Sequence, residues 1–369
     1  MIEADFFYNR LAEAGVGFFT GVPDSLLKDF CAYITGNTEE HNHIIAVNEG
    51  AAVALACGYH LATGRIPLVY MQNSGIGNAV NPLLSLADTE VYRIPLVLVI
   101  GWRGEPGIHD EPQHIKQGKV TCSLFDTMGI PYAVLENTEE GASRQIETCF
   151  NTISETQSPY AFVIRKDTFA PYSFAKEENT ASMKREEAIE VIASCRDGIF
   201  VSTTGMISRE LYELREKENP VNHDRDFLTV GSMGHASSIA LAIALQRPQI
   251  QVTCLDGDGA ALMHLGAFAA IGTKKPNNFC HIVLNNGAHD SVGGQPTIAP
   301  FIDLPAIARA CGYVNIHKAK TMQELQNILA NKNEGLTFIE VMVKKGARKD
   351  LGRPKSSPVE NKIAFMGCM

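Results

Sequence analysis

The 369-residue sequence contains no apolar run near the roughly 20 residues that a transmembrane helix needs. Its first residues, MIEADFFYNR, are acidic and lack the apolar core of a secretory signal. Positive charge is also scarce: 32 Lys and Arg stand against 41 Asp and Glu, for a formal net charge of −9. This balance argues against a nucleic-acid-binding surface. We therefore expect a cytoplasmic protein with no membrane and no nucleic acid among its partners.

Paired cysteines and nucleotide-binding motifs are missing too. The nine cysteines form no C-x-x-C pair, and several lie inside apolar segments, which indicates reduced core thiols and no zinc site. No G-x-x-x-x-G-K phosphate loop occurs. The pair Gly75-x-Gly77 is followed by Val80 where a dinucleotide fingerprint has its third glycine, so nicotinamide binding has weak support.

What the sequence does contain is a repeated alternation of short apolar runs and helical patterns. Runs such as IPLVLVI are typical of strands buried on both faces, and helices are clearest at residues 49–61 and 78–87. Six strands are predicted in each half, at residues 15–22, 43–47, 67–71, 95–100, 132–135 and 160–164, then 198–202, 226–230, 251–255, 279–284, 313–317 and 337–343. The alternation predicts an α/β fold of two doubly wound parallel sheets.

A polar, proline-bearing stretch divides the two halves. We predict a first domain over residues 1–168, a linker over 169–184, a second domain over 185–345 and a C-terminal tail over 346–369.

The densest chemistry lies in residues 251–294. Asp258 stands between Gly257 and Gly259 after one predicted strand, and the pair Asn285-Asn286 follows the next. Such positions form the ligand-binding edge of a parallel sheet. A carboxylate, an amide oxygen and a nearby carbonyl suit Mg²⁺, while glycines and a helix opening after them favour a diphosphate. Each dipeptide alone is also ordinary turn chemistry.

The spacing of GDG, 25 further residues and NN resembles the cofactor motif of thiamine diphosphate-dependent decarboxylases and synthases. The resemblance implies a pyrimidine-binding first domain and a diphosphate-binding second domain, without the middle domain of larger members. It implies thiamine diphosphate and Mg²⁺ as cofactors. The implied metal ligands are the side chains of Asp258 and Asn286 and the carbonyl of Ala288, with Gly257 and Gly259 beside the diphosphate.

The same resemblance gives roles around the cofactor's rings. Glu49, which precedes a small-residue helix, matches the glutamate that hydrogen-bonds the aminopyrimidine and activates the cofactor. A helix-start glutamate near the macrodipole is the alternative. Met233 matches the bulky residue that bends the cofactor. The Gly231 carbonyl matches the acceptor of the cofactor's amino group. The alternative for Met233 is a methionine that fills a gap in the core.

The loop QNSGIGNAVNP, with Asn73 and Gly75, resembles the family's glycine loop that faces the cofactor from a second subunit. The resemblance therefore implies a homo-oligomer, at least a dimer, with active sites between subunits.

Three further loops follow predicted strands and are rich in polar residues. We expect these loops to bring a set of polar side chains toward one cleft: Asp24, Ser25, Arg103, His109, Asp110, His114, Lys116, His289 and Ser291. For any one of these residues taken alone, a solvated position in a loop is the alternative. As a set they favour a substrate site.

These loops and the two-domain build resemble the subfamily of phosphonopyruvate and sulfopyruvate decarboxylases along essentially the whole chain. The resemblance implies a 2-oxo acid bearing a phosphonate, decarboxylated in phosphonate biosynthesis. A sulfonate-bearing acid, carboligation and a non-catalytic thiamine-binding subunit are the alternatives. The implied catalytic residues are Glu49, Asp24, His109 and His114, and the implied substrate-binding residues are Ser25, Arg103, His289, Ser291 and Arg353. Lys116, Arg348 and Lys349 add positive charge, and a disordered basic tail is the alternative for the last two.

Overall fold

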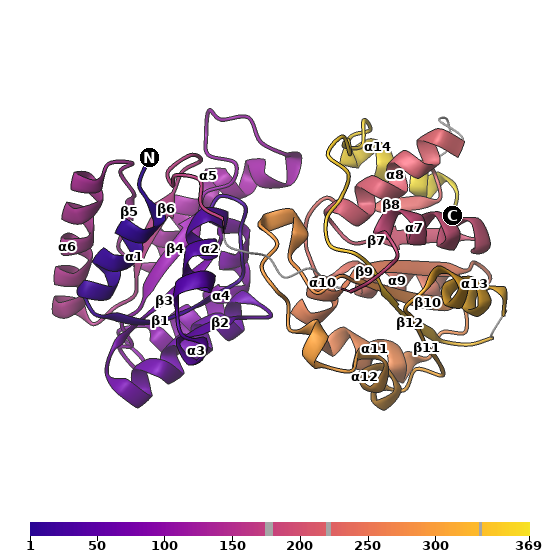
Figure 1. Ribbon diagram of the computed structural model, residues 1–369, viewed down its shortest axis with the longest axis horizontal. Coiled ribbons are helices and arrows are strands. Elements are labelled where there is room, and N and C mark those ends of the chain that lie inside the picture. Colours follow the sequence, from indigo (N-terminus) through magenta and orange to yellow (C-terminus); the bar gives the residue numbers. More distant parts are fainter. Residues whose placement is uncertain (174–179, 219–222, 332–333) are drawn as a thin grey trace. The chain divides into compact units, whose positions relative to one another are not determined.

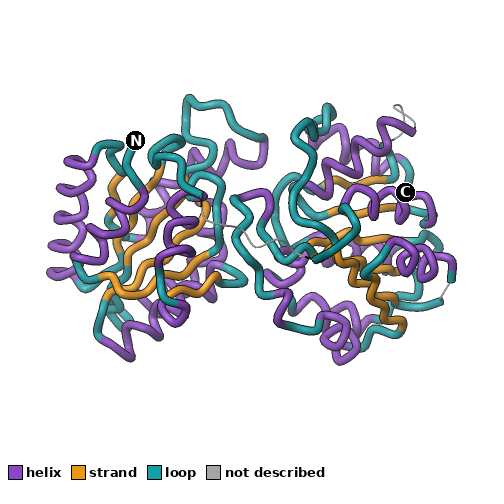
Figure 2. The backbone as a smooth tube through the Cα atoms, in the orientation of Figure 1, coloured by secondary structure: helices purple, strands orange, loops and turns teal. Residues whose placement is uncertain are grey.

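The computed structural model describes residues 1–173, 180–218, 223–331 and 334–369 (Figure 1). It divides into two units near residue 176, with residues 292–295 grouping with the first. Each unit contains one six-stranded sheet with helices around it (Figure 2). The predicted fold class is confirmed, because the described residues form two parallel α/β sheets and no middle domain. Of the expected linker, residues 174–179 lie outside the described residues, and the domain boundaries stay a prediction.

The first sheet has the strand order β2-β1-β3-β4-β6-β5, and every pair is parallel. Its strands are β1 Val16–Gly21, β2 His43–Ile45, β3 Ile66–Gln72, β4 Val97–Gly101, β5 Tyr132–Val134 and β6 Tyr160–Ile164. The helices of this unit are α1 Ala4–Glu13, α2 Lys28–Asn37, α3 Glu49–Thr63, α4 Ile76–Pro82, α5 Pro112–Met128 and α6 Glu139–Thr156.

Alternate residues of the central strands are buried on opposite faces of this sheet. On β3, Leu68 and Tyr70 pack in one cluster with residues of α1, α2 and α6. Their neighbours Val69 and Met71 pack in another with residues of α3, α4 and α5. Burial on both faces is why the strand sequences are continuously apolar rather than alternating.

The second sheet has the order β11-β12-β10-β9-β7-β8, again all parallel. Its strands are β7 Ile199–Ser202, β8 Asp226–Leu228, β9 Val252–Gly257, β10 Phe279–Asn285, β11 Asn315–Ala319 and β12 Thr337–Met342. The helices are α7 Arg185–Cys195, α8 Met206–Glu218, α9 Ala236–Gln246, α10 Asp258–Met263, α11 Gly266–Lys274, α12 Leu304–Cys311, α13 Met322–Ala330 and α14 Pro358–Gly367.

The tail is folded rather than disordered. Its helix α14 lies against the edge strand β8, where the Asn361 side chain accepts from the Leu228 N–H and donates to the Asp226 carbonyl. No helix within the described ranges combines the length and apolarity needed to cross a membrane. All nine cysteines are free thiols.

Several predicted element boundaries differ from the structure by a few residues, and three of the differences have a local cause. The helix expected over residues 78–87 is α4 followed by a π-helical turn at Leu83–Ala87, because Pro82 has no N–H to continue the α-helical pattern. The helix expected to open after the glycines is two helices, α10 and α11, since His264 leaves helical geometry at φ −130 and ψ 52. Strand β11 begins two residues late because Gly312, at φ 107, and Tyr313 still close the end of α12.

Candidate active site

Strand register brings Asp258 and Asn286 to the same edge of the second sheet. Gly257 on β9 pairs with Leu284 on β10, so the residues that follow leave neighbouring strand ends. Asp258 is 2% exposed, and its carboxylate accepts from the Thr297 hydroxyl at 2.5 Å and from the backbone N–H groups of Asn286 and Gly259. Burial raises the pKa of Asp258 to about 6, because those hydrogen bonds offset only part of the lost hydration.

The Asn286 amide is oriented from both sides. Its Nδ2 donates to Asp290 Oδ2 at 2.6 Å, and its Oδ1 accepts from the Ala288 N–H at 3.0 Å. The loop folds back on itself, because Ala288 forms an antiparallel bridge with Pro296 and the Thr297 N–H donates to Gly287. One carboxylate, one amide oxygen and a carbonyl make an oxygen-only donor set, which fits a hard cation such as Mg²⁺.

Met233 lies beside the glycine motif. A tight turn with positive φ at Ser232 and Gly234 presents Met233, whose Cε would be 3.5 Å from a Cβ built on Gly259. His289 would lie 3.1 Å from the same position, and burial lowers its pKa to about 4. Because Gly259 has no side chain, its backbone is uncovered between the Met233 thioether and the neutral His289 imidazole.

Glu49 begins α3 in the first unit and is 6% exposed. The Asn48 side chain caps the helix by accepting from the Ala51 N–H at 2.8 Å. The Glu49 Oε2 accepts from Asn78 Nδ2 at 2.7 Å, and a Cβ on Gly75 would be 2.4 Å from Oε1. The start of α4 and the turn before it therefore pack directly on this carboxylate.

Asp24 lies at the neighbouring strand ends of the first sheet, where Gly21 pairs with Tyr70 and Gln72 pairs with Gly101. It is fully buried and accepts from Gln72 Nε2 at 2.6 Å and from the Leu26 N–H at 2.9 Å. Burial raises its pKa more than these bonds and the Arg103 charge lower it.

Arg103 is anchored by its own loop. Its guanidinium donates twice to Asp110, at 2.8 and 2.5 Å, and once to Ser25 at 2.7 Å. Asn73, which is 1% exposed, accepts from the Arg103 N–H at 3.2 Å and donates to its carbonyl at 2.8 Å and to Thr121. The Asn73 side chain thus ties the glycine loop to the arginine loop.

His109 in that loop and His114 in the first turn of α5 lie in different surroundings. His109 is exposed, whereas His114 is 9% exposed with a buried Nδ1 that has no hydrogen-bond partner. Burial and the Arg103 charge lower the pKa of His114 to about 4, so it is neutral at physiological pH.

The remaining candidates are nearer to solvent. Gly231 is half-buried, Ser291 is exposed with its Oγ 3.9 Å from a Cβ built on Gly205, and Arg353 is exposed in the loop before α14. Arg348 forms ion pairs with Glu186, Glu213 and Asp350, so its charge is neutralised within the second unit. Lys116 and Lys349 are exposed.

Sequence reasoning missed several supporting residues. Asn78 bonds Glu49, Thr297 bonds Asp258, and Asp290 bonds Asn286. Asp290 and Thr297 lie in the polar stretch after β10, and Asn78 lies in the sequence QNSGIGNAVNP. The polar composition of these two stretches was the available sign of a functional role. Which residue bonds which depends on how these segments fold back, and the spacing of residues along the sequence does not reveal that.

The comparisons with known proteins identify the family of the chain. Residues 2–124 match the model described as thiamine pyrophosphate enzyme, N-terminal TPP binding domain, and residues 201–341 match the corresponding C-terminal TPP binding domain. A phosphonopyruvate decarboxylase of Streptomyces viridochromogenes is 35% identical to this chain, covering 98% of this chain and 93% of the relative. The chain belongs to the phosphonopyruvate decarboxylase family of thiamine diphosphate enzymes.

Two further relatives in this comparison show the breadth of the family. The phosphonopyruvate decarboxylase of Streptomyces hygroscopicus is also 35% identical, covering 98% of this chain and 92% of the relative. A sulfopyruvate decarboxylase of Methanosarcina acetivorans is 29% identical, covering 91% of this chain and 90% of the relative. Membership of the phosphonopyruvate decarboxylase family confirms the predicted decarboxylase class and the thiamine diphosphate cofactor.

Proposed function

We propose that this enzyme decarboxylates 3-phosphonopyruvate to phosphonoacetaldehyde and CO₂ in phosphonate biosynthesis, in the cytoplasm. The observation that carries the proposal is the end-to-end similarity to two proteins named for that substrate, over 98% of this chain. The sulfopyruvate decarboxylase that matches over a comparable length, 91% of this chain, is less similar, at 29% identity.

Arg103 is the proposed anchor for an oxyanion of the substrate. A guanidinium has five N–H donors, and three are given to Asp110 and Ser25, which leaves two. The bidentate bond to Asp110 fixes the plane of the group before substrate arrives, so less side-chain entropy is lost on binding. Ser25 belongs to the same proposed site, and His289, Ser291 and Arg353 are assigned to substrate binding from the second unit.

The second unit is proposed as the diphosphate-binding domain, with Gly257 and Gly259 beside the diphosphate. Asp258, the Asn286 oxygen and the Ala288 carbonyl would hold Mg²⁺, since they form an oxygen-only set. Met233 and the Gly231 carbonyl are assigned to positioning the cofactor's rings. Thiamine diphosphate, when bound, supplies the electron sink for loss of CO₂.

The first unit is proposed as the pyrimidine-binding domain, where Glu49 holds a proton at the cofactor's ring nitrogen. The Asn78 bond and the contact with Gly75 would keep its carboxylate in place. Asp24, His109 and His114 are assigned to the proton transfers on the substrate. Burial supports this for Asp24, because it raises the pKa of the carboxyl and so stabilises the protonated form relative to an exposed aspartate.

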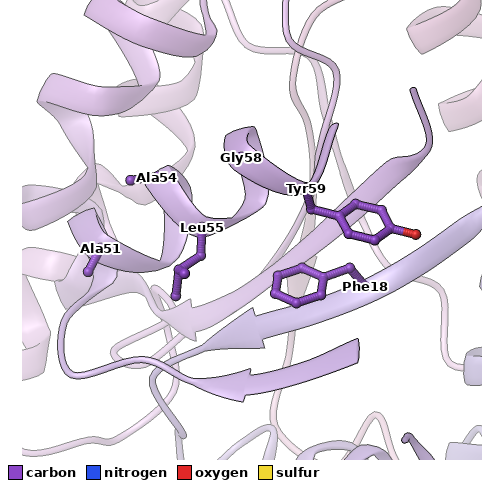
Figure 3. A pocket seen from close by; sticks show the side chains of 6 residues that line it. All are labelled: Phe18, Ala51, Ala54, Leu55, Gly58 and Tyr59. Carbon is purple, nitrogen blue, oxygen red and sulfur yellow. The ribbon is translucent and has the colours of Figure 1, made fainter. Parts of the chain in front are cut away.

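We also propose that two copies associate, so that active sites form between subunits. An apolar recess of about 610 Å³ lies on α3, the helix that Glu49 begins, and it is lined by Phe18, Ala51, Ala54, Leu55, Gly58 and Tyr59. Figure 3 shows the stacked rings of Phe18 and Tyr59 beside the small side chains of the helix. Leu55 is 36% exposed there, so Leu55→Arg should shift the protein to monomers in sedimentation velocity; a variant that sediments like the wild type contradicts this face.

The substrate proposal is tested by following phosphonopyruvate with ³¹P NMR in the presence of the purified protein, thiamine diphosphate and Mg²⁺. We expect its resonance to be replaced by that of phosphonoacetaldehyde, with equimolar CO₂. Unchanged phosphonopyruvate, together with release of CO₂ from sulfopyruvate, would overturn the substrate and keep the enzyme class.

A further inference from the structure

We propose that Asp290 is a positioning residue that fixes the Asn286 amide with its oxygen toward the cation. The inference rests on the metal site proposed above. An asparagine can rotate by half a turn and exchange its oxygen for its NH₂ group, and only the oxygen can ligate a cation. A metal site built on an asparagine therefore needs something that sets the orientation of the amide.

The structure supplies two contacts that select the same orientation. A carboxylate accepts hydrogen bonds and donates none, so Asp290 Oδ2, at 2.6 Å from Nδ2, selects the NH₂ end. The Ala288 N–H, at 3.0 Å, donates to the oxygen end. Reversing the amide would oppose two oxygens on one side and two N–H groups on the other.

Asp290 is itself held by partners from distant parts of the second unit. Its Oδ2 accepts from Arg185 Nη1 at 3.2 Å and from the Gly346 N–H at 2.8 Å. Arg185 is 5% exposed and bonds Glu210 twice, at 2.8 and 2.9 Å. One buried arginine thus faces two carboxylates, and this surplus of negative charge beside Asn286 also favours a cation.

The neighbouring asparagine shows the same construction without a proposed ligand role. Asn285 Nδ2 donates to Glu340 Oε1 at 2.7 Å, and its Oδ1 accepts from the Gly287 N–H at 3.0 Å. Glu340 in turn pairs with Lys318. Asn285 therefore offers a matched comparison, because a similar change there disturbs a similar contact one residue away.

The test is the affinity for Mn²⁺, measured by electron paramagnetic resonance on the full-length protein with thiamine diphosphate present. Asp290→Ala removes the acceptor of the Asn286 NH₂ group and leaves Arg185 paired with Glu210, so the Asn286 amide can reverse. We expect the Mn²⁺ Kd to rise about 10- to 100-fold, the usual effect of losing a group that orients a metal ligand. Glu340→Gln should leave the Kd nearly unchanged.

The melting temperature of the metal-free protein separates positioning from mere support of the loop. If Asp290 acts only structurally, Asp290→Ala will lower this temperature and leave the Kd at the wild-type value, which overturns the inference. Asp290→Asn is the second variant, because it keeps an oxygen that can accept from Asn286, Arg185 and Gly346. It should bind Mn²⁺ much more tightly than Asp290→Ala, and equal Kd values in the two variants would contradict orientation of the amide as the cause. A wild-type protein that binds no Mn²⁺ would instead contradict the proposed metal site.

Discussion

Replacing Gly75 with alanine should disable Glu49 without disturbing the backbone. Gly75 has φ −72 and ψ −16, a conformation that alanine adopts freely. The added Cβ would nevertheless be 2.4 Å from Glu49 Oε1 and 2.6 Å from both Cδ and Cγ. Ordinary carbon–oxygen contacts are about 3.4 Å or longer, so the carboxylate must move by roughly 1 Å.

Such a displacement breaks the 2.7 Å bond from Asn78 and takes Glu49 from its proposed place beside the cofactor. Overpacking of this kind costs about 1–3 kcal/mol of folding free energy. A misplacement of about 1 Å in a catalytic constellation lowers the rate by about 10²-fold. We therefore expect Gly75→Ala to remain folded at 25 °C and to lose about 99% of its CO₂ release.

Gly77→Ala is the matched control, since it changes a glycine only two residues along the chain from Gly75. A Cβ built on Gly77 has no neighbour within 4 Å, and the residue lies inside α4, where alanine is favoured over glycine by about 1 kcal/mol. The kcat for CO₂ release and the urea-unfolding free energy are measured for both variants. Wild-type kcat in Gly75→Ala would refute the assignment of Glu49 and the geometry around it.

Three further predictions concern single side chains. Glu49→Gln keeps the shape but not the acid, so kcat should fall by about 10²- to 10⁴-fold; turnover like the wild type would contradict a proton-holding role. Thr297→Val removes the hydroxyl that bonds Asp258, and the Mn²⁺ Kd should rise about 10-fold or more; an unchanged Kd would show that the backbone N–H groups suffice. The pKa of His114 is lowered from 6.5 to about 4, so the unfolded chain binds more protons than the folded one between those values. The unfolding free energy of the wild type should therefore fall by at most about 3 kcal/mol as pH drops from 6.5 to about 4. In His114→Gln, the unfolding free energy measured with urea should depend less on pH over this range. An equal pH dependence in the two proteins would contradict the burial of a neutral imidazole.

The fold was largely predictable because its strands are buried on both faces. A strand such as β4 has no solvent face, so its sequence is continuously apolar and stands out from the amphipathic helices. The predicted helices differ from the structure where a single residue interrupts the helical pattern of its neighbours. Pro82 changes the type of helix, and His264 divides a helix that its apolar neighbours would continue.

The candidate site was predictable where it depends on strand ends and not where it depends on loop folding. Asp258 and Asn286 follow adjacent strands, and their juxtaposition comes from a register that parallel pairing makes regular. The bond between Asn286 and Asp290 depends instead on a loop held by Arg185, which is 105 residues from Asp290 in the sequence. Contacts of that kind have no sequence period, so only the structure reveals them.

Substrate preference tests the central claim most directly. The purified protein, with thiamine diphosphate and Mg²⁺, is supplied in parallel with phosphonopyruvate, sulfopyruvate and pyruvate, and kcat/KM is determined from CO₂ release. We predict the highest kcat/KM for phosphonopyruvate. A higher kcat/KM for sulfopyruvate would contradict the proposed substrate, and absence of CO₂ from all three would contradict the proposed 2-oxo acid decarboxylation as a whole.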